Sequence, residues 1–122
     1  MTAPKTSEVA AYITRLAESA VEAAGSARAA LAETIAAGGA LDSHTLRPAM
    51  TAEAEALPWR NLLELTKGGA DIFEALDTVR ATLTRNLLER GESQSTDALA
   101  NDNARLQREA DRQFLRSTRG LD

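Results

Sequence analysis

Five arginines near the end of the sequence recur at steps of three and four residues, and their side chains are the ones best placed for chemistry. This spacing puts them on one face of an α-helix, called the arginine face here: Arg105, Arg108, Arg112, Arg116 and Arg119. Only two acids, Glu109 and Asp111, lie within residues 103–119, so this segment has a net charge of +3 in a chain whose net charge is −4. Because guanidinium groups bind carboxylates or phosphates through paired hydrogen bonds, the pattern predicts a helix that docks on an acidic partner.

A thin apolar stripe accompanies the arginine face. Phe114 and Leu115 are its largest members, and we expect them to add apolar contacts to a docked partner. One alternative is a solvated helix whose arginines pair with acids elsewhere in the chain. Another is contact with nucleic-acid phosphates, which the negative net charge of the whole chain disfavours.

No pattern in the sequence predicts catalysis, a metal site or a cofactor site. His44 is the single histidine and cysteine is absent, so the nitrogen and sulfur ligands of a zinc site are lacking. Gly68 and Gly69 follow Lys67 and no strand precedes them, so they do not form a phosphate-binding loop. A serine nucleophile needs a positioned base and an oxyanion hole, and the sequence offers no candidate for either. We therefore expect a non-enzymatic protein.

The composition bounds the class of protein further. The 122 residues suit one small domain, but only 3% of them are aromatic, so few large side chains can anchor a core. We therefore expect self-association to add apolar burial. The N-terminal residues lack the pattern of a signal peptide, and no apolar run is long enough to cross a membrane. Together with the absence of cysteine, this predicts a cytoplasmic homo-oligomer without a membrane partner.

Two amphipathic stripes predict the helices of the body. The first consists mostly of small residues: Val9, Ile13, Leu16, Ala20, Ala23, Ala27, Leu31 and Ile35. The second is rich in leucine, and we assign its large members to oligomerisation: Leu62, Leu65, Ile72, Leu76, Val79, Leu83 and Leu87. Because each stripe places an apolar side chain at every helical turn, the two helices are expected to pack against each other and against further copies.

Local signals set the expected helix ends. The first helix should run from Ser7 to Ala37, since Ser7 can cap the N-terminus and two glycines follow Ala37. Residues 40–50 are predicted to be a connection, with at most one short turn. The next helix should begin after Thr51 as its N-cap and be kinked or restarted at Pro58.

The pair Gly68-Gly69 allows two predictions. The leucine-rich stripe passes through Gly69 without losing phase, which favours a continuous or slightly kinked helix that ends at Gly91. Alternatively, the helix stops at Gly68 and restarts at Asp71, because Asp71 and Glu74 have the spacing of a capping box. We favour the continuous helix.

The fold class predicted from these elements is all-α. Residues 1–91 should form the oligomerisation body, a long antiparallel hairpin or small bundle with coiled-coil packing. Residues 92–97 are polar, which is typical of a flexible linker. Residues 98–122 should form a separate basic docking helix, so the body is expected to fold without it.

This layout favours a helical adaptor that recruits a partner through its C-terminal helix. It resembles that of small terminase subunits, the ring-forming DNA-packaging adaptors of phages and related elements. The resemblance implies an oligomeric helical hairpin and a C-terminus that contacts a motor subunit, although a clear N-terminal helix-turn-helix is lacking. The other hypotheses are a nucleic-acid-binding regulator or antitoxin, a secretion-chaperone or surface-coat protein, and an accessory subunit of a larger enzyme.

Overall fold

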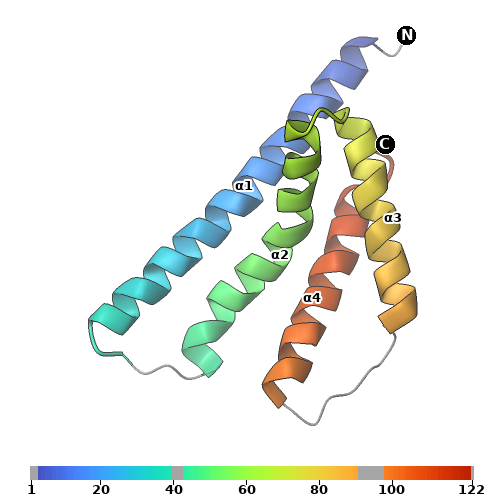
Figure 1. Cartoon of the computed structure of the whole chain (residues 1–122). Helices are drawn as coiled ribbons and strands as arrows, with labels where there is room; N and C mark the ends of the chain where they lie inside the picture. Colours follow the sequence, from blue (N-terminus) through green and yellow to red (C-terminus); the bar gives the residue numbers. More distant parts are fainter. Residues whose placement is uncertain (1–2, 40–42, 91–97, 122) are drawn as a thin grey trace.

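The computed structural model describes residues 3–39, 43–90 and 98–121, and all regular secondary structure in these ranges is helical. The helices are α1 (Ala3–Ala36), α2 (Ser43–Lys67), α3 (Ile72–Arg90) and α4 (Ala98–Ser117). Consecutive helices run in opposite directions, with α1 and α4 on either side of α2 (Figure 1). Because α2 contacts each of the other three helices, it is the centre of the fold. The predicted all-α class is confirmed.

Helix α1 begins four residues before the predicted Ser7 and ends where the glycines predicted. Gly38 has a positive φ of 81°, a conformation that glycine adopts without steric cost. The N–H groups of Gly38 and Gly39 donate to the carbonyls of Ile35 and Thr34 at 3.0 and 2.8 Å. These bonds satisfy carbonyls that the end of the helix would otherwise leave without donors.

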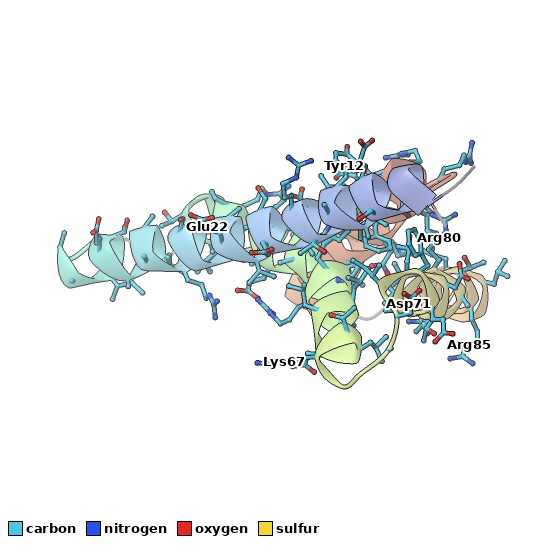
Figure 2. All side chains as sticks on the ribbon, turned by 90° about the horizontal axis from the view of Figure 1, so that it is seen from above. Tyr12, Glu22, Lys67, Asp71, Arg80 and Arg85 are labelled. Carbon is cyan, nitrogen blue, oxygen red and sulfur yellow. The ribbon has the colours of Figure 1, made fainter. Side chains whose placement is uncertain are left out.

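The first two helices pack closely because α1 offers small residues to α2. Ile13, Ala17 and Ala24 are fully buried on α1. Arg28 of α1 lies 2.9 Å from Glu53 of α2, and this contact is held by charge rather than by a well-aligned hydrogen bond. The last turns of α1 extend past α2 (Figures 1 and 2), and Ile35 there is 48% exposed.

Helix α2 corrects the prediction for residues 40–57. It begins at Ser43, so His44 and Pro48 are helical and Thr51 is not an N-cap; residues 40–42 lie outside the described ranges. The buried residues in this part of α2 include Ala49, Ala54 and Ala56. Such small side chains give a weak apolar periodicity, which is why the sequence pattern failed to reveal a helix here.

Pro58 lies inside α2 without ending it. Proline has no N–H, so the carbonyl of Ala54 loses its normal partner four residues on. Gln107 of α4 supplies the missing donor, because its Nε2 lies 3.1 Å from that carbonyl. The same Nε2 donates to the buried carboxylate of Asp111 at 2.9 Å. Helix α2 bends along its length (Figure 1). Helix α4 packs against α2 at the carbonyl that has no donor because of the proline.

The favoured prediction of a continuous helix through the two glycines is wrong. Helix α2 ends at Lys67, and Gly69 has a φ of 107°, which an α-helix cannot contain. The alternative prediction holds, because Asp71 accepts a hydrogen bond from the N–H of Phe73 at 3.0 Å and so caps α3. The chain therefore reverses direction here, and the leucine-rich stripe is divided between two antiparallel helices.

The hydrophobic core forms where all four helices meet. Its buried members come from α1 to α4: Ile13, Ala17, Trp59, Leu62, Ala75, Leu76, Val79, Leu83 and Phe114. The rings of Trp59 and Phe114 meet edge to face, with centroids 4.5 Å apart. Helix α4 is thus a member of the bundle, and this corrects the prediction of a separate C-terminal helix.

A second contact fastens the end of α4. Arg80 of α3 donates to the carbonyl of Leu115 at 2.8 Å and to the hydroxyl of the fully buried Thr118. A cation at a helix C-terminus is stabilised by the carbonyls that have no helical donor there. Core packing, Gln107 and Arg80 therefore hold α4 at three points along its length.

Candidate functional site

The arginine face of α4 points away from the core. Phe114, which is 2% exposed, lies on the opposite side of the helix together with the buried Ala110. Four of the five arginines are exposed and the fifth, Arg108, is half-buried: Arg105, Arg108, Arg112, Arg116 and Arg119. Four of these arginines lie on α4, whose orientation is set by its buried side, and Arg119 follows the end of the helix at Ser117.

The ion pairing described on this face is weak. Arg112 lies 3.1 Å from Glu109, one turn earlier on the same helix, and both side chains are more than half exposed. Exposed pairs of this kind contribute only about 0.3–0.5 kcal/mol. Arg108 also has a polar or electrostatic partner. Arg112 can exchange its contact for one with a bound acid at little cost.

The apolar residues predicted to contact a partner have a different position. Phe114 lies in the core against Trp59, and the half-buried Leu115 packs against the same core. Neither side chain can turn outward to contact a partner without exposing the hydrophobic core to water. The surface that α4 offers is therefore polar and cationic.

Residues assigned to oligomerisation from the sequence lie largely inside one chain. Leu62, Leu76, Val79 and Leu83 are core residues, and Ile72 packs against them. Leu65 is 37% exposed, and Leu87 is half-buried. The stripe therefore serves the folding of a single chain, and self-association stays a prediction that would require other surface residues.

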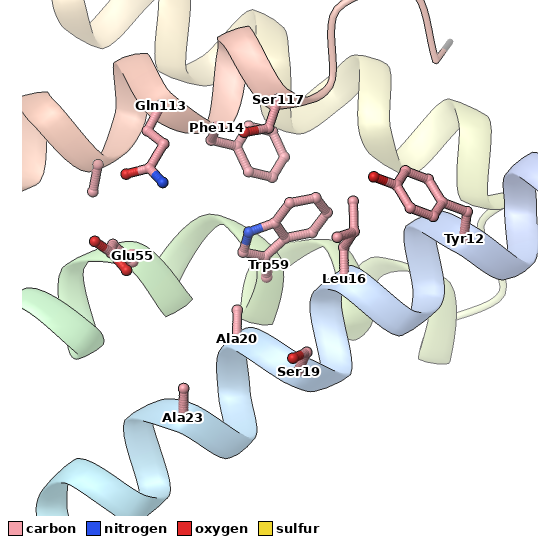
Figure 3. Close-up of a pocket in the computed structure, with 11 residues that line it drawn as sticks. Tyr12, Leu16, Ser19, Ala20, Ala23, Glu55, Trp59, Gln113, Phe114 and Ser117 are labelled. Atoms are coloured by element: carbon pink, nitrogen blue, oxygen red, sulfur yellow. The ribbon is translucent and has the colours of Figure 1, made fainter.

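A pocket of about 340 Å³ opens between α1, α2 and α4 (Figure 3). Trp59 of α2 lies at its centre, between Leu16 of α1 and Phe114 of α4. Ala20 leaves space on the α1 side, and Glu55 lies at one end. The pocket exists because α1 and α4 both pack on α2 while leaving a gap between themselves.

Sequence reasoning did not predict this pocket. Its lining comes from three helices, and the periodicity of one helix does not report which others flank it. Composition held one usable signal: the chain has four aromatic residues, and Tyr12, Trp59 and Phe114 all line this one space.

The described residues offer neither a metal cluster nor a membrane-crossing helix. Ranges 3–39, 43–90 and 98–121 contain no group of three histidine, cysteine or acidic side chains that could hold a metal ion. Among the same residues, none of the helices combines the length and the apolar character that crossing a bilayer requires. The arginine face and the pocket are the two features that a functional interpretation can use.

Comparison with known proteins identifies no relative. No protein-family model, curated protein or solved structure matches the chain. Functional inference therefore depends on these two features alone.

Proposed function

We propose that this protein is a non-enzymatic helical adaptor that binds an acidic protein surface through the arginine face of α4. The observation that supports the proposal most strongly is the division of α4 into two sides. One side is fixed by the buried Ala110 and Phe114, while Arg105, Arg112 and Arg116 are exposed on the other.

A fixed helix changes the energetics of docking relative to a disordered tail. A segment that orders only on binding loses about 2–5 kcal/mol of its interaction energy to ordering. The backbone of α4 is already ordered by Gln107, Arg80 and the core. Binding then needs only the arginine side chains to be immobilised, so a short acidic segment is a sufficient partner.

An acidic protein is favoured over nucleic acid. The whole chain has a net charge of −4, so a long polyanion would be repelled by surfaces away from α4. A compact acidic patch can approach the arginine face and avoid those surfaces. The resemblance to small terminase subunits is not retained, because it required a C-terminal helix separate from the body.

A charge-reversal experiment tests this proposal. Replacing Arg105, Arg112 and Arg116 with glutamate should weaken binding of a short, labelled poly-glutamate peptide by at least about tenfold, because like charges then face each other. Fluorescence anisotropy at low salt measures the affinity. For the unmodified protein, binding should weaken as salt is added.

The matched control reverses three exposed arginines on the other helices, Arg15, Arg47 and Arg85. Both triple variants change the net charge by the same amount. A difference in peptide binding between them therefore reports which surface the peptide contacts. Equal loss of peptide binding in the two variants would contradict a specific role for α4. Tighter binding of a short DNA duplex than of poly-glutamate, lost in the α4 variant alone, would favour a nucleic-acid partner instead.

A further inference from the structure

We propose that the pocket between α1, α2 and α4 binds a small amphipathic amine. Its apolar body would lie against Trp59 and Phe114, and its ammonium group would lie at Glu55. The site is distinct from the arginine face, because Glu55 and Trp59 belong to α2 and the pocket opens between helices.

The size and lining of the pocket suit an apolar body. Small-molecule sites typically measure about 300–1,000 Å³ and are lined mainly by apolar and aromatic side chains. This pocket has a volume of about 340 Å³, and three of the four aromatic residues of the chain line it. A single ring or a short branched chain would fill such a space.

The indole of Trp59 presents a polar group to the pocket. Trp59 is only 8% exposed. The indole nitrogen lies on the side of the ring that faces Glu55 and Gln113 (Figure 3). The indole N–H is a hydrogen-bond donor, and a ligand that carries a hydroxyl or carbonyl oxygen would accept a hydrogen bond from it.

The charge of the pocket lining determines which charge the ligand should have. Among the described residues that line the pocket, Glu55 is the only one whose side chain is charged at neutral pH. Its carboxylate favours a cation and opposes an anion. Aromatic rings beside the carboxylate add to the attraction, because ring faces attract ammonium groups. The amide of Gln113 and the hydroxyl of Ser117 are neutral and can serve either end of the ligand.

Trp59 also makes the proposal measurable, because it is the only tryptophan in the chain. Its fluorescence should change saturably as phenylalaninol, which has a phenyl ring, a hydroxyl and an ammonium group, is added. For a ligand of this size we expect a dissociation constant of about a millimolar. The carboxylate counterpart 3-phenylpropionate should give no saturable change.

Two variants connect this signal to the pocket. Glu55→Gln should weaken phenylalaninol binding about twofold to fivefold, as expected when an exposed charge pair is lost. The control Glu64→Gln removes an exposed carboxylate from the same helix beside a separate hollow between α2 and α3, and it should leave the affinity unchanged. Ala20→Leu should abolish binding by filling the space.

Three results would overturn the proposal. These are equal affinity for phenylalaninol and 3-phenylpropionate, equal effects of Glu55→Gln and Glu64→Gln, and no saturable signal up to about ten times the expected dissociation constant. Circular dichroism of each variant separates loss of the pocket from loss of the fold. Because Glu55 is exposed, its variant should stay folded and so tests the proposal even if Ala20→Leu unfolds.

Discussion

Truncating the chain after Arg90, which removes α4, should abolish cooperative unfolding of the remaining residues. The truncation removes Phe114 from the core and uncovers Trp59, and loss of a buried phenylalanine side chain alone typically costs about 3–5 kcal/mol. It also leaves the carbonyl of Ala54 without the donor that Gln107 provides. Because whole domains are stable by only about 5–15 kcal/mol, thermal denaturation followed by circular dichroism should show no sharp transition.

Single substitutions on α4 provide a milder test than deletion of the whole helix. Phe114→Ala should lower the urea midpoint strongly, whereas Arg112→Ala on the exposed side of the same helix should change it little. A truncated chain that melts at the same temperature as the full chain would show that α1 to α3 fold independently. The layout expected from the sequence alone would then be correct.

Leu76→Asp should unfold the protein at any concentration. Leu76 is fully buried among residues of its own chain, and an unpaired carboxylate there costs on the order of 4–5 kcal/mol. The control is Leu88→Asp on the same helix, where the leucine is 80% exposed. This change should alter stability by no more than about 0.5 kcal/mol.

Urea denaturation and light scattering together identify which surface Leu76 serves. We expect loss of folded structure for Leu76→Asp. If this variant instead gave a folded chain of lower mass than the unmodified protein, Leu76 would face another copy, as the stripe alone suggested. Dissociation of an oligomer by Leu88→Asp would place an interface at the exposed end of α3.

Signals close together in the sequence predicted structure well. The glycines after Ala37 predicted the end of α1, and the positive φ of Gly38 explains why. The spacing of Asp71 and Glu74 indicated the start of α3, and the capping hydrogen bond to Phe73 is present. Each of these features depends on a few neighbouring residues, so a short stretch of sequence contains the relevant physics.

Features that depend on distant residues were not predictable in this way. The three-four spacing of apolar residues continues through Gly69, which suggested one long helix. Two helices joined by a turn can keep the same spacing when both face the same core. Pro58 should disrupt a helix considered by itself. The compensating donor is Gln107, about fifty residues further on, and nothing near Pro58 reveals it.

The candidate site was predicted in part. The spacing of the arginines placed them on a common face, and the structure has that face exposed. Phe114 was assigned to a partner because an apolar stripe on an isolated helix has no other evident use. Its contact with Trp59 closes a pocket that involves three helices, and single-helix periodicity cannot report such an arrangement.

Native-state hydrogen exchange tests most directly whether α4 is a structural member of the bundle that presents a fixed arginine face. Amides in the core of a cooperative unit exchange through the same opening, with similar protection. We predict that peptides covering residues 106–117 are protected to the same degree as those covering residues 59–66 of α2. Exchange of residues 106–117 at the rate of an unstructured peptide, with α2 still protected, would contradict this structure and the function proposed from it.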